Sequence, residues 1–203
     1  MVAGKSIDFT LSRDGEVFLL TLSSDDGMNR LTRSLVTSLT EEILSFQESS
    51  SDDLPVLPLL ISGFTNFSVG ADLNEINQLS APAAFEFAQA GQRLMQTVAE
   101  YPSPVFAFIG GYCMGGGLDL ALACHRRICA PNAIFGHRGA ALGLMTGWGG
   151  TQRLPRLIGK GRAMQMFVAA EKMNAEQALA AGLVEAIADD PVTYVTETLL
   201  RSL

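Results

Sequence analysis

The feature that most constrains the fold is a glycine-rich turn in the middle of the chain, GGYCMGGGLDL at residues 110–120. An apolar, β-prone run, Val105–Ile109, leads into it, and a helix-forming run, Leu118–Cys124, leaves it. Successive glycines at a helix start permit positive φ and let a ligand approach the main chain closely. The first N–H groups of a helix have no partner inside it and favour negative charge. The turn therefore predicts a site for an anion or an oxyanion, or else a strand-to-helix turn needed only for packing.

The rest of the chain alternates strand-like and helix-like runs, which favours an α/β fold built from βα units with parallel pairing. The segment Arg13-Asp14-Gly15 is typical of a hairpin turn. The predicted strands are Ile7–Leu11, Val17–Leu22, Leu57–Ser62, Val105–Ile109, Arg127–Ala130 and Ala133–Phe135. The predicted helices are Leu31–Leu44, Ala81–Ala99, Leu118–Cys124, one opened by Gly147–Gly150 and broken by Pro155, Gly161–Ala170, and Thr193–Leu203.

Length and charge narrow the class of protein. A chain of 203 residues fits one domain with a sizeable core. The net charge of −7 disfavours nucleic acid as a partner, although one phosphorylated small molecule is compatible with it. The three cysteines are odd in number and indicate free thiols, and no ligand spacing predicts a metal site. We expect neither a signal peptide nor a membrane span, and therefore a cytoplasmic protein.

Three stretches together resemble the crotonase family of enoyl-CoA hydratases and isomerases. They are Phe67–Leu73, the run GGYCMGGGLDLALAC, and Gly147–Pro155 continuing through Gly159–Ala163. The resemblance extends from about Ile7 to Ile187. It implies a spiral of ββα units, with residues 1–187 as the core domain. Residues 188–203 would form a short helix in place of the family's longer helical extension.

The resemblance also implies an acyl-CoA thioester as ligand, with coenzyme A as part of the substrate and no other cofactor. By position, the backbone N–H groups of Ala71 and Gly116 would hold the thioester carbonyl. Fixed amide donors stabilise the charge of an enolate-like intermediate without reorganising. The alternative for residues 69–71 is an ordinary tight turn.

By the same resemblance, the loop before the first long helix would contact the nucleotide end of coenzyme A. Arg30 would pair with a phosphate there, or else remain a solvated surface side chain. The expected substrate- or CoA-binding residues are Asn29, Arg30, Ser68, Val69, Gly70, Asp72 and Gly115.

The chain departs from the family at both catalytic glutamates. Asp119 stands where the GGGxE pattern has the first one, and it keeps a carboxylate with a shorter reach; its alternative role is to serve the helix macrodipole. Gly139 stands where the FGxPE pattern has the second, and glycine transfers no proton, which puts ordinary hydration in doubt.

Two histidines remain to be placed. His137 lies two residues before Gly139, so in an extended segment it would face the vacated space as a second acid or base. The alternative is a histidine hydrogen-bonded within the fold. We interpret His125 as a C-terminal partner of the helix that precedes it.

Two functions follow from these observations. The first is an enzyme that stabilises a thioester enolate, with Asp119 and His137 as its acid–base residues and its reaction altered from plain hydration. The second is a non-catalytic CoA-binding or assembly protein, which Gly139 and the shortened end favour. Family members usually continue with helices that cover the acyl site and assemble trimers, so we expect a homo-oligomer, a trimer or hexamer, that buries the apolar surface left uncovered.

Overall fold

The computed structural model describes residues 9–14, 17–48 and 56–195. Its main sheet has the strand order β1-β2-β4-β6-β8-β11. β1 and β2 pair antiparallel, with Asp14 opposite Val17, as the predicted hairpin requires, and the remaining neighbours are parallel. The strands are β1 (Phe9–Asp14), β2 (Val17–Leu22), β4 (Leu59–Gly63), β6 (Val105–Ile109), β8 (Arg126–Cys129) and β11 (Ala186–Ile187).

Short second strands form two smaller sheets, one of β3 and β5 and one in the order β10-β9-β7. A bridge between Ser68 and Cys113 joins the two. These strands are β3 (Arg30–Leu31), β5 (Gly70–Ala71), β7 (Tyr112–Met114), β9 (Ile134–Gly136) and β10 (Lys172–Asn174). In the ββα units, the first strand therefore joins the main sheet, the second strand joins a small sheet, and a helix follows. This is the predicted spiral of ββα units.

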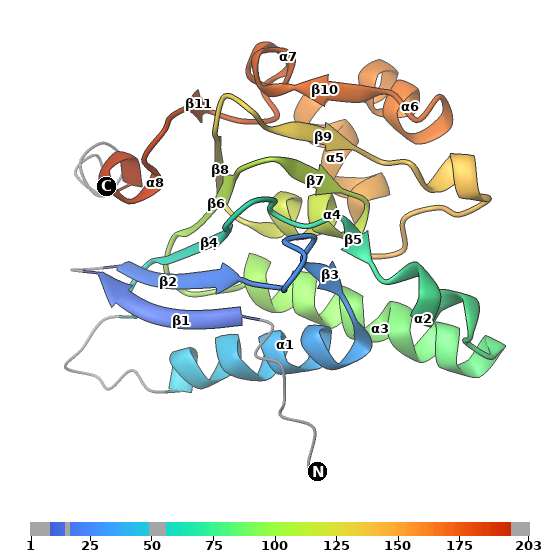
Figure 1. The fold of residues 1–203 in the computed structure, drawn as a ribbon, viewed down its shortest axis with the longest axis horizontal. Coiled ribbons are helices and arrows are strands. Elements are labelled where there is room, and N and C mark those ends of the chain that lie inside the picture. The colour runs from blue at the N-terminus through green and yellow to red at the C-terminus, as the bar shows by residue number, and fades with distance from the viewer. Residues whose placement is uncertain (1–8, 15–16, 49–55, 196–203) are drawn as a thin grey trace.

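Helices cover the sheets on both sides, and α1 and α3 pack against each other along one side (Figure 1). The helices are α1 (Arg33–Glu48), α2 (Leu73–Asn77), α3 (Ala81–Ala99), α4 (Gly116–Ala123), the short 3₁₀ helix η1 (Gly139–Leu142), α5 (Gly150–Ile158), α6 (Lys160–Val168), α7 (Ala175–Ala181) and α8 (Pro191–Tyr194). Within the described ranges, no helix is both long and apolar enough to cross a membrane.

β6 and α4 explain why the glycine-rich turn lies deep in the molecule. All five residues of β6 are buried, because parallel strands flank it on both sides and its side chains pack into apolar clusters on both faces. α4 begins at Gly116, two residues before the predicted start, and is buried from Gly117 to Ala123. Gly115 has φ +51, a conformation that favours glycine, and ends the turn. The turn is thus held in place by an apolar strand before it and an apolar helix after it.

Two sequence expectations about elements are wrong. Pro155 does not break its helix: α5 continues to Ile158, losing one backbone hydrogen bond, and ends at Gly159, whose φ is +84. His125 does not serve the helix before it. Its Nδ1 accepts from the Val105 N–H (2.9 Å) and its Nε2 lies 3.1 Å from the Ala99 carbonyl, so it joins the end of α3 to β6. Of the predicted helix 193–203, residues 196–203 lie outside the described part.

Candidate active site

A cavity of about 660 Å³ brings most of the predicted site residues together. Its walls come from the loop before α2, from α2 and α3, from the glycine-rich turn, and from the segment between β9 and α5. The predicted residues that line it are Val69, Gly70, Ala71, Gly115, Gly116, Asp119 and His137. The lining is otherwise mainly apolar, including Ile76, Leu79, Phe87, Leu142, Met145 and Trp148.

The amides of Ala71 and Gly116 lie close together at this cavity. A Cβ atom built on Gly116 would lie 3.4 Å from the Ala71 nitrogen, and one built on Gly70 would lie 2.9 Å from the Gly116 nitrogen. Gly70 adopts φ +91 where β5 meets the turn, a conformation that favours glycine. Small residues therefore bring two main-chain amides from separate units of the fold to one wall of the cavity.

Asp119 lies in the first turn of α4, and its side chain is only 1% exposed. Its Oδ2 accepts a hydrogen bond from the hydroxyl of Thr146, in the loop between η1 and α5. Its Oδ1 has no hydrogen-bond partner among the described residues. A buried carboxylate oxygen without a donor is costly, so it is a natural place for a proton or a ligand group.

His137 supplies the group closest to that oxygen. Its Nε2 lies 3.3 Å from Asp119 Oδ1, and this nitrogen also has no hydrogen-bond partner in the described part of the chain. The imidazole is 4% exposed at the cavity wall and packs against the ring of Phe167, with centroids 5.0 Å apart. In the described part of the chain, therefore, no hydrogen bond within the fold holds His137 at Nε2.

Two glycines fix the surroundings of this pair. A Cβ atom on Gly150 would lie 2.1 Å from Asp119 Oδ1 and 3.0 Å from His137 Nε2, so only glycine leaves room for both side chains. A Cβ atom on Gly139 would lie 2.7 Å from the carbonyl oxygen of Leu144. The Leu144 N–H also donates to the Gly139 carbonyl (2.8 Å), which closes this loop tightly. The position of the family's second glutamate thus admits no side chain in this conformation.

The side chains of Asn29 and Ser68, which were predicted to contact the ligand, are buried and bonded to the protein. Ser68 is fully buried; its hydroxyl donates to the Asn29 carbonyl (2.7 Å) and accepts from the Gly70 N–H (3.1 Å). The side-chain amide of Asn29 donates to the carbonyls of Asn66 (2.7 Å) and Phe67 (3.3 Å). Both side chains therefore hold the loop that carries Ala71.

Asp72 and Arg30 are also engaged by the protein. Asp72 caps α2, accepting from the N–H groups of Asn74 and Glu75. Arg30 lies 2.5 Å from Asp26 in an exposed ion pair. The hydrogen bond from Arg30 is the largest of the effects that lower the pKa of Asp26 to about 2. Arg30 therefore already has an anionic partner, which a phosphate would have to replace.

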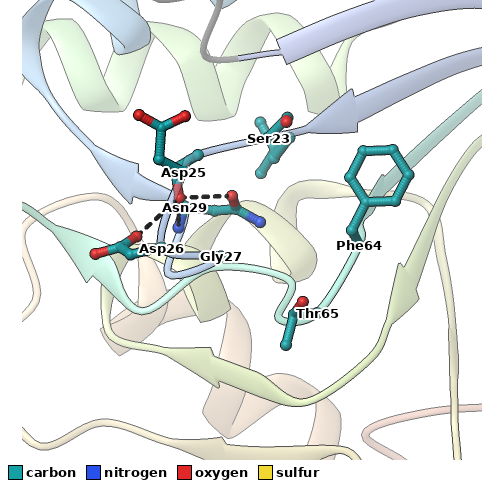
Figure 2. A pocket seen from close by; sticks show the side chains of 9 residues that line it. Ser23, Asp25, Asp26, Gly27, Asn29, Phe64 and Thr65 are labelled. Carbon is teal, nitrogen blue, oxygen red and sulfur yellow. Dashed lines mark hydrogen bonds between the residues drawn. The ribbon is translucent and has the colours of Figure 1, made fainter.

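Beside this ion pair lies a second, smaller hollow of about 220 Å³ (Figure 2). Asp26 and Asn29 lie on one side of it, and Phe64 and Thr65 lie across from them. Asp25 and Asp26 give this hollow an acidic character that does not suit the phosphates of coenzyme A. Within the described ranges, no three His, Cys, Asp or Glu side chains gather as metal ligands.

Thr146, Trp148 and Gly150 are the site residues that sequence reasoning missed. Trp148 and Gly150 lie in the stretch Gly147–Pro155, which marked the family resemblance but was given no role in the site, and Thr146 directly precedes it. The signal available was the position of this stretch immediately before a helix, where glycines commonly allow close approach. The contact of Thr146 with Asp119 joins residues 27 apart and has no local signature.

Comparisons with known proteins identify the family of the chain. The sequence pattern described as Enoyl-CoA hydratase/isomerase matches residues 12–202. The crotonyl-CoA hydratase of Syntrophomonas wolfei subsp. wolfei is 36% identical over 180 residues, which are 87% of this chain and 67% of that protein.

Solved structures show the same likeness in three dimensions. A structure of DspI from Pseudomonas aeruginosa has a TM-score of 0.86 at 33% identity, covering 97% of this chain and 80% of that one. The enoyl-CoA hydratase from Bacillus anthracis has a TM-score of 0.84 at 30% identity, covering 96% and 74%. The fold, the motifs and these matches together establish that the chain belongs to the enoyl-CoA hydratase/isomerase (crotonase) family.

Proposed function

We propose that this protein is an acyl-CoA or enoyl-CoA thioester enzyme that stabilises a thioester enolate. The observation that carries the proposal is the meeting, at one apolar cavity, of two closely spaced main-chain amides with the buried Asp119–His137 pair. The names of the relatives, a crotonyl-CoA hydratase and an enoyl-CoA hydratase, support this substrate class.

In this proposal, the amides of Ala71 and Gly116 donate to the thioester carbonyl oxygen. When a C2–H bond breaks, the electron pair moves into the C1–C2 bond and the carbonyl electrons move onto oxygen, where the two amides stabilise the charge. Donors of this kind are worth about 10²–10³-fold each in rate. The adjacent glycines supply the room that the carbonyl needs to reach both amides.

Asp119 and His137 handle the protons in place of two glutamates. One member of the pair accepts the proton from C2, and the other delivers or withdraws the second proton that completes the reaction. Because the two groups lie 3.3 Å apart, they work as a coupled pair rather than on opposite faces of a water. This arrangement supports isomerisation, hydrolysis or decarboxylation as much as hydration.

Turnover of a thioester panel tests the proposal. The protein is incubated with saturated, 2-enoyl and 3-enoyl thioesters of coenzyme A, and products are identified by mass spectrometry together with NMR, which distinguishes isomers of equal mass. Hydration adds the mass of water, isomerisation leaves the mass unchanged, and hydrolysis releases free coenzyme A. We expect turnover of at least one class, lowered about 10²–10⁴-fold in Asp119→Asn. Tight binding without any turnover would instead support a non-catalytic CoA-binding protein.

We further propose a homo-oligomer in a reducing compartment such as the cytoplasm. Exposed apolar side chains on α5 and α6, Leu157, Met164 and Val168, support self-association. The three cysteines are free and buried, which supports the reducing compartment. Light scattering of the purified protein measures the mass of the assembly, and a monomeric mass at working concentration would contradict the first of these proposals.

A further inference from the structure

Trp148, the only tryptophan of the chain, is built into the wall of the cavity. It lies in the loop before α5 and is 6% exposed. The loop is held from both sides: the Gln92 side chain donates to the Gly147 carbonyl (2.9 Å), and Arg153 donates to the Trp148 carbonyl (3.2 Å). These two hydrogen bonds therefore fix the loop that places the indole in the cavity wall.

Two glycines from different helices provide the space that the indole fills. A Cβ atom on Gly91, in the middle of α3, would lie 2.0 Å from the indole Nε1, and one on Gly116 would lie 2.5 Å from Cζ3. Glycine inside a helix is destabilising relative to alanine, and the space that the indole occupies explains why glycine stands at position 91. Phe87 packs edge-on against the indole, with ring centroids 5.2 Å apart. Gly91, Gly116 and Phe87 thus form a slot that holds the indole.

This slot lies next to the expected position of the reacting carbonyl. The indole covers Gly116, whose amide is a proposed donor to the thioester oxygen. On the side of α2 and α3, the cavity is lined by apolar side chains, Ile76, Leu79, Ala84, Phe87 and Ala88. The indole fills the space between Gly116 and Gly91, so an acyl chain that starts beside Gly116 and extends toward α3 ends against it.

We propose that Trp148 determines which acyl chains the enzyme accepts, by closing the α3 side of the acyl pocket. This inference rests on the proposed function and adds a substrate class to it: an apolar acyl thioester of limited length. Each methylene that a pocket buries is worth about fourfold in affinity. Affinity therefore rises with chain length until the chain meets the indole, and then stops rising.

The test uses the fluorescence of Trp148 itself. The wild-type protein is titrated with saturated acyl-CoA thioesters of increasing chain length, and the emission change and affinity are recorded. We expect the emission to change with every bound acyl-CoA but not with coenzyme A lacking an acyl group. Binding of acyl-CoA without any emission change would overturn the proposal.

Variants measure the length limit. Calorimetry of Trp148→Ala should place the limit at least two carbons beyond that of the wild type, with Trp148→Phe between them. Leu44→Ala, at an exposed position on α1 outside the cavity lining, serves as the matched control and should keep the wild-type profile. An unchanged limit in both Trp148 variants would contradict the proposal. If no acyl-CoA binds to any protein, the proposed function itself fails.

Discussion

At the scale of single residues, the hydrogen bond from Thr146 decides how Asp119 presents its carboxylate. The bond occupies Oδ2 and leaves Oδ1 to face His137. A hydrogen bond to a charged group is worth about 1.5–3 kcal/mol, roughly 10–100-fold in rate if the carboxylate must be held in the transition state. Thr146 is therefore a positioning residue for the proposed reaction.

Removing this hydroxyl should lower kcat by roughly 10–100-fold and leave KM nearly unchanged. Thr146→Val keeps the shape of the side chain without the donor, whereas Thr146→Ser keeps the donor. Steady-state kinetics on the best thioester should show the loss in Thr146→Val and recovery in Thr146→Ser. Equal losses in both variants would mean that packing, not the hydrogen bond, is what Thr146 contributes.

Restoring the family's glutamate should not restore hydratase chemistry. In Gly139→Glu, the new Cβ would meet the Leu144 carbonyl at 2.7 Å, so the loop must open. We expect the free energy of unfolding to fall by about 1–3 kcal/mol, as for other overpacked sites, and hydration to stay at the wild-type level. Urea denaturation and a hydration assay measure both. Ala140→Glu, one residue along at an exposed position, is the control for added charge and should be close to neutral.

At the scale of elements, α3 and α5 are joined through the contact of Gly91 with Trp148. Gly91→Ala should destabilise the protein by about 1–3 kcal/mol, because the new Cβ would lie 2.0 Å from the indole. Gly161→Ala in α6 is the matched control: no atom lies within 4 Å of its built Cβ, so it should be neutral or stabilising by about 0.5–1 kcal/mol. Chemical denaturation followed by circular dichroism compares them. Similar effects at the two positions would mean that Gly91 is not needed to make room for the indole.

Elements with strong local signals were predictable from the sequence, and the contacts between them were not. Val105–Ile109 and Ala81–Ala99 have their predicted bounds, because one is a continuous apolar run and the other has a Ser80 cap with proline in its first turn. The place of Asp119 at the cavity was predictable from the family motif, and that of His137 from its spacing to Gly139. The roles of Thr146, Trp148 and Gly150 depend on how the loop before α5 folds back onto α4, which no local pattern encodes.

At the scale of the whole molecule, buried thiols make stability depend on alkaline pH. Burial raises the pKa of Cys129 to about 11 and, with smaller opposing effects, that of Cys124 to about 12, from an ordinary value of 9.0. Above pH 9 the unfolded chain loses thiol protons that the folded chain keeps. The free energy of unfolding should therefore be highest below pH 9 and fall as the pH rises toward 11.

Urea denaturation across this pH range measures the free energy of unfolding. In Cys129→Ala, the fall of this free energy with pH should be shallower than in the wild type. Equal slopes for Cys129→Ala and the wild type would contradict the assignment.

We propose that the amides of Ala71 and Gly116 and the Asp119–His137 pair generate an enolate at C2 of a bound thioester. Exchange of the C2 hydrogens of a saturated acyl-CoA in D₂O tests it without requiring the complete reaction. We expect the wild-type protein to place deuterium at C2, as detected by mass spectrometry and NMR. We expect exchange by Asp119→Asn to be at least about 10²-fold slower. If calorimetry shows that an acyl-CoA thioester is bound but its C2 hydrogens do not exchange, these residues do not generate an enolate.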